Sequence, residues 1–252
     1  MPICAILFLL TGLTMLQASD DRTPIQKKYA ARTQNAFEQA KARYLADTNN
    51  VKLAIAFASA AFDSGDAAAD DSKREDYAKD GIAAANRLLD QDAKSAAGHY
   101  YLAMNQGQWA KADAPSLTSY RLVKEMEKEF KLANTYDETF DYAGPARCLG
   151  ELYRDAPGWP ISIGSRKKAR EYLEKASKIA PKYPENRLNL AESYVKWKDL
   201  DAARKELSGL DAIWSKAKAQ LSDPYWDQPW EEWAERREAL HKKLDESDAS
   251  AK

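Results

Sequence analysis

The stretch GPARCLGELYRDAPGWPISIGSRKKAREYLEKASKIAP, residues 144–181, combines two helical patterns with an apolar, proline-rich connector. In the first pattern, Leu149, Gly150 and Tyr153 recur at a spacing that places them on one face of a helix. In the second, Ala169 and Leu173 repeat four positions apart, also on one face. The stretch therefore predicts two helices packed as a hairpin.

A second copy of this pattern follows 41 positions later, where Leu190, Ala191 and Tyr194 replace Leu149, Gly150 and Tyr153. Both copies fit the L-G-x2-Y and A-x3-F spacing of the tetratricopeptide repeat, whose period is about 34 residues. Ala203 follows Ala191 by 12 positions, whereas Ala169 follows Gly150 by 19. The extra 7 positions account for the long repeat distance, so the first copy carries an insertion between its helices.

The composition favours helices along the whole chain. Only 10 of the 252 residues are glycine, and no segment sustains the alternation of a strand. We therefore expect an all-α fold, a tetratricopeptide-like solenoid of helical hairpins with an N-terminal helix. A tryptophan-rich C-terminal cap is expected to cover the last repeat. Its apolar face is predicted from Trp230, Trp233, Leu240 and Leu244.

The charge balance argues against two classes of partner. The chain has 38 basic and 39 acidic residues, which gives a formal net charge of −1. Nucleic acid and an anionic membrane surface both attract proteins with a clear excess of positive charge. Neither is expected to be the main partner, and we predict no nucleic-acid binding.

The first residues resemble an export signal. Residues 3–16 form an apolar run of signal-peptide length, and the small residue Ala18 fits a cleavage site. No cysteine follows the run at the position that a lipoprotein signal requires. We expect a cleaved signal peptide at 1–18, a single repeat domain at 19–245 and a disordered tail at 246–252. The mature chain is then periplasmic or secreted, with no transmembrane span.

Three hairpins are predicted to carry extended connectors, at 64–76, 108–116 and 155–165. Insertions at the same place in successive repeats of a solenoid fall on one face. We therefore expect the three connectors to lie side by side.

The central motif resembles the T-component family of TRAP transporters, and the resemblance covers roughly residues 77–210. The stretch GHYYLAMNQGQW, residues 98–109, is similar to an earlier helix of that family. The matching positions of the central motif are Gly144, Pro145, Arg147, Leu149, Gly150, Leu152, Tyr153, Ala156, Pro157, Gly158, Pro160, Gly164, Lys168, Ala169, Arg170, Glu171 and Tyr172. The pattern is also similar to the helical-repeat domain of regulator-of-microtubule-dynamics proteins.

The resemblance implies a function in binding. Members of the T-component family are all-helical periplasmic proteins that associate with a solute-binding protein and self-associate around a hydrophobic channel. By this resemblance the chain is a scaffold that docks a partner protein such as a TRAP-type solute-binding protein, with a homo-oligomer as a further expectation. The alternative is a small-molecule carrier or channel component with a cavity for an apolar or carboxylate ligand, closed by the 155–165 loop.

The sequence offers no catalytic or metal-binding constellation. It lacks C-x2-C, H-E-x2-H, G-x-S-x-G and glycine-rich phosphate loops, so no enzyme activity, metal or cofactor is expected. The two histidines, His99 and His241, are far apart, and His99 takes the place of a core tryptophan of the repeat. We interpret His99 as a packed core residue.

Two arginines lie in first helices, which line the concave surface of such solenoids. Arg147 and Arg187 either pair with neighbouring carboxylates, such as Glu151, or present guanidinium groups to an acidic ligand or peptide. Both interpretations remain open. Together with Tyr153 and Tyr194, these arginines are predicted to line a groove.

Trp159 stands in the insertion between Gly158 and Pro160. A wide aromatic group held by prolines is suited to anchoring a partner, but it is equally suited to plugging the repeat groove. We predict an ordered flap over the groove, and either role is open. The flap consists of Pro157, Trp159, Pro160 and Ile161.

Overall fold

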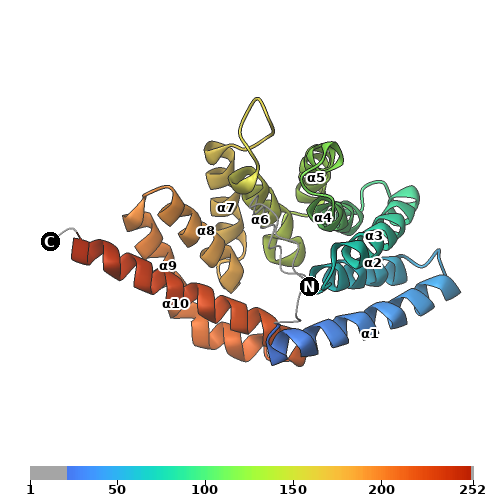
Figure 1. The fold of residues 1–252 in the computed structure, drawn as a ribbon, viewed down its shortest axis with the longest axis horizontal. Coiled ribbons are helices and arrows are strands. Elements are labelled where there is room, and N and C mark those ends of the chain that lie inside the picture. The colour runs from blue at the N-terminus through green and yellow to red at the C-terminus, as the bar shows by residue number, and fades with distance from the viewer. Residues whose placement is uncertain (1–21, 251–252) are drawn as a thin grey trace.

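The computed structural model describes residues 22–250, and its regular structure in that range is helical apart from one isolated bridge between Gly158 and Gly164 (Figure 1). The expected signal peptide at 1–18 lies outside the described residues. The helices are α1 (Pro24–Ala46), α2 (Val51–Asp66), α3 (Asp71–Gln91), α4 (Ala96–Ala112), α5 (Leu117–Tyr136), α6 (Phe140–Asp155), α7 (Arg166–Ile179), α8 (Pro184–Lys196), α9 (Leu200–Gln220), the 3-10 helix η1 (Pro224–Trp226) and α10 (Asp227–Ser250).

The helices pair into four hairpins, α2 with α3, α4 with α5, α6 with α7, and α8 with α9. Their starts follow from local sequence. Thr23 caps α1 with Pro24 in the first turn, and the side chains of Asn50, Ser95 and Ser165 accept backbone hydrogen bonds at the starts of α2, α4 and α7. The predicted all-α solenoid of helical hairpins is confirmed.

The first helices of the hairpins form the inside of the curve. Helix α2 contacts α4, α4 contacts α6, and α6 contacts α8, whereas contacts of this extent do not join α3, α5, α7 and α9 to one another. Elements on the inside of a curved array lie closer together than those on the outside. We call α2, α4, α6 and α8 the inner wall.

The two ends of the array touch. Helix α1 packs on α2, helix α10 packs on α8 and α9, and α1 and α10 also contact each other along the lower edge of Figure 1. The Arg32 guanidinium donates to the Tyr225 carbonyl at 3.0 Å, and Lys28 Nζ lies 3.4 Å from Asp227 Oδ2. These polar contacts link the two ends of the solenoid.

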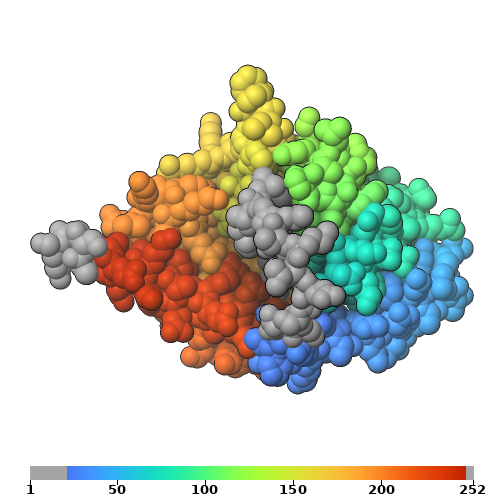
Figure 2. All heavy atoms as spheres, in the orientation of Figure 1, coloured from blue at the N-terminus to red at the C-terminus, as the bar shows by residue number. Residues whose placement is uncertain are grey.

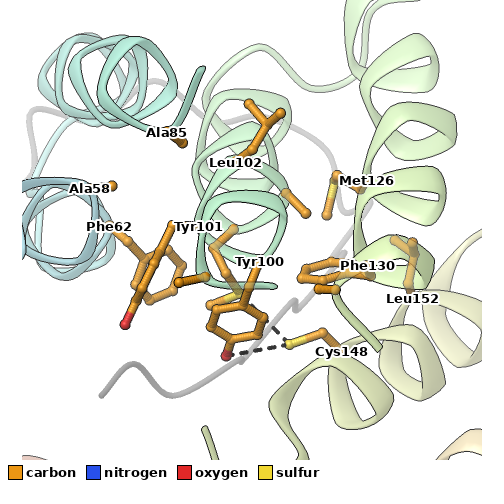
Figure 3. Packing of buried hydrophobic residues seen from close by; sticks show 14 of the residues in the cluster. Ala58, Phe62, Ala85, Tyr100, Tyr101, Leu102, Met126, Phe130, Cys148 and Leu152 are labelled. Atoms are coloured by element: carbon orange, nitrogen blue, oxygen red, sulfur yellow. Dashed lines mark hydrogen bonds between the residues drawn. The ribbon is translucent and has the colours of Figure 1, made fainter. Parts of the chain in front are cut away.

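The apolar core follows the repeat pattern. Figure 3 shows Tyr100, Phe130 and Met126 packed between α4, α5 and α6, with Cys148 Sγ 3.9 Å from the Tyr100 hydroxyl oxygen. The apolar repeat positions predicted from the sequence are all buried: Leu149, Ala169, Leu173, Ala176, Leu190, Ala191, Ala203 and Leu207.

The tryptophan-rich cap is also confirmed. Trp230 and Trp233 are buried with their ring centroids 4.9 Å apart, and the Trp230 indole donates to the Leu221 carbonyl at 2.7 Å. Leu240 and Leu244 extend the same buried face along α10. This helix continues to Ser250, so the predicted tail boundary at 246 lies inside a helix, and residues 251–252 lie outside the described residues.

Two of the three predicted connectors are much shorter than expected. Helices α2 and α3 leave only residues 67–70 between them, and α4 and α5 leave only 113–116. Ser64 is buried in the last turns of α2, where its hydroxyl donates to the Thr33 carbonyl at 2.9 Å. The polar residues at 71–76 lie in the first turns of α3, after the Asp70 cap, where polar side chains are compatible with a helix. Only 156–165 is a long insertion within a described hairpin.

No helix among the described residues is both long enough and apolar enough to cross a membrane.

Gly150 marks the closest approach of α6 to α7. A Cβ atom at this position would lie 2.5 Å from Leu173 Cγ and 3.0 Å from the Leu173 backbone nitrogen. Gly150→Ala is therefore expected to lower the free energy of unfolding by about 1–3 kcal/mol, because the two helices must move apart. Urea unfolding measures the effect. Gly158→Ala is the matched control, because its Cβ would meet only the Gly164 carbonyl at 3.8 Å. Equal stability of the two variants would contradict the predicted repeat alignment.

Candidate functional site

Helix α6 begins with an unusual backbone turn. Asp141, Tyr142 and Ala143 have φ values of 50°, 54° and 64°, in the left-handed region that residues other than glycine rarely adopt. Each such residue costs about 1–2 kcal/mol in local conformational energy. Pro145 follows in the first right-handed turn, where its missing N–H is tolerated. The surrounding structure must stabilise this turn.

The buried side chain of Arg147 holds the turn from inside. Its Nη1 donates to the carbonyl oxygens of Asp141 and Tyr142 at 3.3 and 3.4 Å, and its Nη2 donates to Asp141 Oδ2 at 3.1 Å. The Tyr100 hydroxyl donates to the same carboxylate oxygen at 2.6 Å. Arg147 Nε lies 3.9 Å from Glu185 Oε2 on α8. The guanidinium thus connects the turn with the next hairpin.

Asn186 completes this joint. Its Nδ2 lies within hydrogen-bonding distance of the carbonyl oxygens of Tyr142 and Ala176, at 3.0 and 3.1 Å, and its Oδ1 accepts from Arg147 at 3.2 Å. The Tyr142 ring stacks on Tyr183 with centroids 4.5 Å apart. One amide therefore ties α6, α7 and α8 together. Sequence reasoning missed it, although an asparagine among the buried positions of α8 was a visible signal.

Arg147 consequently does not line a groove. Its side chain is 0% exposed, and its carboxylate partners are Asp141 and Glu185, while Glu151, the expected partner one turn away, interacts elsewhere. The interpretation of Arg147 as a pairing residue is supported. Its predicted role as a donor to an incoming ligand is contradicted by its burial.

Tyr153 and Tyr194 are also buried, and they connect successive repeats. The Tyr194 hydroxyl donates to Glu174 on α7 at 2.7 Å, and the Tyr153 hydroxyl donates to Glu127 on α5. In both cases the tyrosine of a first helix bonds a glutamate of the preceding second helix. The two tyrosines occupy equivalent repeat positions, so this is a repeated packing contact. Their predicted place in an open groove is wrong.

Arg187 differs from Arg147 because its side chain keeps 19% of its surface exposed. It lies 2.8 Å from Glu206 Oε2 on α9 and donates to the Pro181 carbonyl at 2.9 Å. It pairs within its own hairpin, and its hydrogen bonds to described residues do not involve the 156–165 loop. The four predicted groove residues therefore do not form one surface.

The 156–165 loop is closed by its own backbone. Gly164 N donates to the Pro157 carbonyl at 2.9 Å, and Ser165 N donates to the Tyr153 carbonyl at 2.8 Å. Near the tip, Ile161 N donates to the Gly158 carbonyl at 3.1 Å. A Cβ at Gly164 would lie 2.0 Å from the Ala156 carbonyl oxygen, so glycine is needed where the strands of the loop meet.

The loop projects away from the solenoid. Figures 1 and 2 show the 156–165 segment standing out at the top of the molecule. Trp159 is 88% exposed and Ile161 is 66% exposed. The predicted flap is wrong in position, because these side chains cover no groove, and Trp159 does not plug one. The prediction of a flap is wrong because neighbouring helices already cover Arg147, Tyr153 and Tyr194.

The base of the loop borders only a narrow crevice. Pro157 and Ser162 face Pro115 and Tyr120 across a space of about 20 Å³, too small for a ligand. The cavity that the carrier hypothesis placed under this loop is therefore not formed by the described residues.

A network of buried charges crosses the inner wall toward α10. The Arg236 guanidinium lies 2.8 Å from Glu192 Oε2 and 3.9 Å from Glu185 Oε1, and Asn189 links Arg236 to Glu151. Burial raises the pKa of both Glu151 and Glu185 above the usual carboxylate range, because the ionised forms lose hydration. The network fastens the cap to α6 and α8.

The histidine interpretation is confirmed. His99 is buried, its Nδ1 lies 2.6 Å from Glu129 Oε2, and its Nε2 lies 3.1 Å from the Ala93 carbonyl oxygen. In the described part of the chain, no three histidine, cysteine or acidic side chains are grouped so that they could hold a metal ion.

Comparison with known proteins supports the repeat assignment. A tetratricopeptide repeat family model matches residues 164–220, which span α7, α8 and α9. No curated protein matches the chain. The match and the stacked hairpins establish a tetratricopeptide-like helical-repeat protein, whereas the resemblance to TRAP T-components stays a prediction.

Arg147→Met tests whether the buried guanidinium holds the joint between hairpins. It leaves the Asp141 and Glu185 carboxylates without their partner and the left-handed turn without its donor. We expect a loss of about 3–5 kcal/mol in the free energy of unfolding, measured by urea unfolding. Arg187→Met is the control, because Arg187 has one carboxylate partner and the two side chains are 19% and 17% exposed, so its loss is expected to be clearly smaller. Equal losses of stability in the two variants would contradict the role of Arg147 in holding the joint between the hairpins.

Proposed function

We propose that this protein is a non-enzymatic helical-repeat scaffold that binds a partner protein through its 156–165 loop. Repeats of this type typically mediate interactions between proteins, and the match to residues 164–220 supports that general role. The observation that carries the proposal is the exposure of Trp159 and Ile161 on a loop whose backbone is closed by hydrogen bonds.

Two properties of the loop favour a role in recognition, its exposed apolar surface and its ordered backbone. An exposed indole next to an exposed isoleucine leaves apolar surface in water, which is unfavourable unless a partner covers it. The backbone hydrogen bonds from Gly164 and Ile161 hold the loop in one shape before binding. A preorganised aromatic side chain loses little conformational entropy on binding, so it is well suited to be a hot spot.

The partner we propose is a periplasmic solute-binding protein of the TRAP type. The support is the resemblance of the Gly144–Pro145 and Ala156–Pro157–Gly158 motifs to the T-component family. A second copy of this chain is the competing occupant of the loop. The carrier hypothesis is less favoured, because the loop does not cover a ligand-sized space.

Trp159→Ala tests the loop directly. The mature protein is used to capture partners from an extract of its own periplasm, and calorimetry then measures binding of the captured protein. We expect binding to weaken by about 2 kcal/mol, with helical content unchanged, because the indole contacts only the partner.

Leu45→Ala is the matched control, because Leu45 is also exposed, at 63%, but lies at the end of α1. Its binding is expected to equal that of the wild type. A Trp159→Ala variant that binds equally well would exclude the loop from recognition. Loss of self-association in place of partner binding would identify a second copy as the occupant.

Export to the periplasm is part of the proposal and rests on residues 3–16 and Ala18. Amino-terminal sequencing of the protein from a native periplasmic extract is expected to begin near Ser19. A protein that starts at Met1 and fractionates with the cytosol would contradict it.

A further inference from the structure

Asp63, on the inner-wall helix α2, is a buried carboxylate without a full set of partners. Asp63 is 8% exposed, and its Oδ1 has no hydrogen-bond partner among the described residues. Buried polar atoms are almost always paired, because an unpaired one loses hydration without compensation. This carboxylate therefore needs an explanation that the fold does not supply.

The neighbouring inner-wall groups are also short of donors. Asp141 Oδ1 is buried and has no hydrogen-bond partner within the described part of the chain, and the same holds for the amide oxygen of Gln108 on α4. Asp66, one turn after Asp63, accepts from Gln108 Nε2 at 3.3 Å. This part of the wall presents acceptors that lack donors.

The nearby cations are committed to other groups. Arg32 on α1 donates to the carbonyl oxygens of Pro224 and Tyr225, and Arg147 pairs with Asp141 through its Oδ2. Among the contacts of the described residues, neither guanidinium pairs with Asp63. Negative charge at Asp63 is therefore not neutralised by a direct ion pair in the described residues.

The electrostatics agree with this geometry. The pKa of Asp63 is raised to about 6, mainly by burial and in smaller part by the Asp66 and Asp141 carboxylates, while the Arg32 charge opposes the rise. Three tyrosines lie close enough to feel the same charge: besides burial, Asp63 raises the pKa of Tyr29, Tyr101 and Tyr225. The faces of such rings attract cations, and the Arg32 guanidinium already lies over two of them, with its carbon 5.4 Å from the Tyr29 ring centroid and 5.6 Å from the Tyr225 ring centroid.

We propose that Asp63 anchors a binding site for a primary ammonium group, carried by a free alkylamine or by the lysine side chain of a bound segment. An ammonium group brings three donors and one positive charge, which are what Asp63 and the unpartnered oxygens lack. A water molecule would supply donors but no charge. This site is separate from the 156–165 loop and does not depend on the partner proposed for it.

Calorimetry of the full chain tests the proposal with cadaverine as the free amine and an acetylated, amidated Gly-Lys-Gly peptide as the lysine source. The uncharged diol 1,5-pentanediol is the control ligand. We expect at least one of the two amines to bind and the diol not to bind. The amine that binds more tightly identifies the source, and binding of neither amine at millimolar concentration would overturn the proposal.

Asp63→Asn is expected to weaken amine binding at least tenfold at pH 7. Asp80→Asn is the matched control, because Asp80 on α3 is already paired with Lys41 at 2.7 Å, and it is expected to bind as the wild type does. Equal binding by Asp63→Asn and the wild type would remove Asp63 from the site, and equal binding of diol and amine would exclude recognition of charge.

The pH dependence supplies a second readout. The pKa of Asp63 is raised in the folded state, from 3.8 to about 6. Its neutral form therefore favours folding at low pH, and this contribution is lost as the pH rises through about 6. Without ligand at pH 7, Asp63→Asn is expected to melt at or above the wild-type temperature. Amine binding to the wild type is expected to strengthen from pH 5 to pH 7. A lower melting temperature, or binding that is independent of pH, would show that Asp63 has a structural role only.

Discussion

The contact between the Arg147 guanidinium and the left-handed turn at 141–143 supports the joint between the third and fourth hairpins. Three consecutive non-glycine residues with positive φ are unfavourable on their own. Arg147 and Asn186 offset this cost by hydrogen-bonding the carbonyl oxygens that the turn exposes to the interior. Because Arg147 also lies near Glu185 on α8, the geometry of the turn and the position of the next hairpin are set together.

This joint explains why a charged residue that looks suited to bind a ligand is used within the fold. Arg147 has carboxylates on two sides and no exposed surface, so its charge is neutralised where it lies. Asp63 is the opposite case on the same inner wall, since it is buried but Oδ1 has no donor among the described residues. A buried charge with partners stabilises structure, whereas one without them favours a ligand that supplies the missing charge.

The two surfaces proposed for binding also differ in physical character. The 156–165 loop presents Trp159 and Ile161 to solvent on a backbone closed by hydrogen bonds, which suits an apolar contact with a protein. Asp63 lies among other carboxylates and near the Gln108 amide oxygen, which suit a small cation. Substitutions at Trp159 and at Asp63 are therefore expected to act independently.

The sequence by itself determined the hairpins, because the period of apolar residues and the small residue Gly150 encode which helix faces pack. It also predicted the cap at Trp230 and Trp233 and the buried His99, whose roles follow from the repeat pattern. The direction of the 156–165 loop, the burial of Arg147 and Tyr153, and the contact between α1 and α10 were decided only by tertiary structure. These features depend on partners distant in the chain, such as Asn186 for Arg147 and Tyr225 for Arg32, and no local pattern specifies which distant groups will meet.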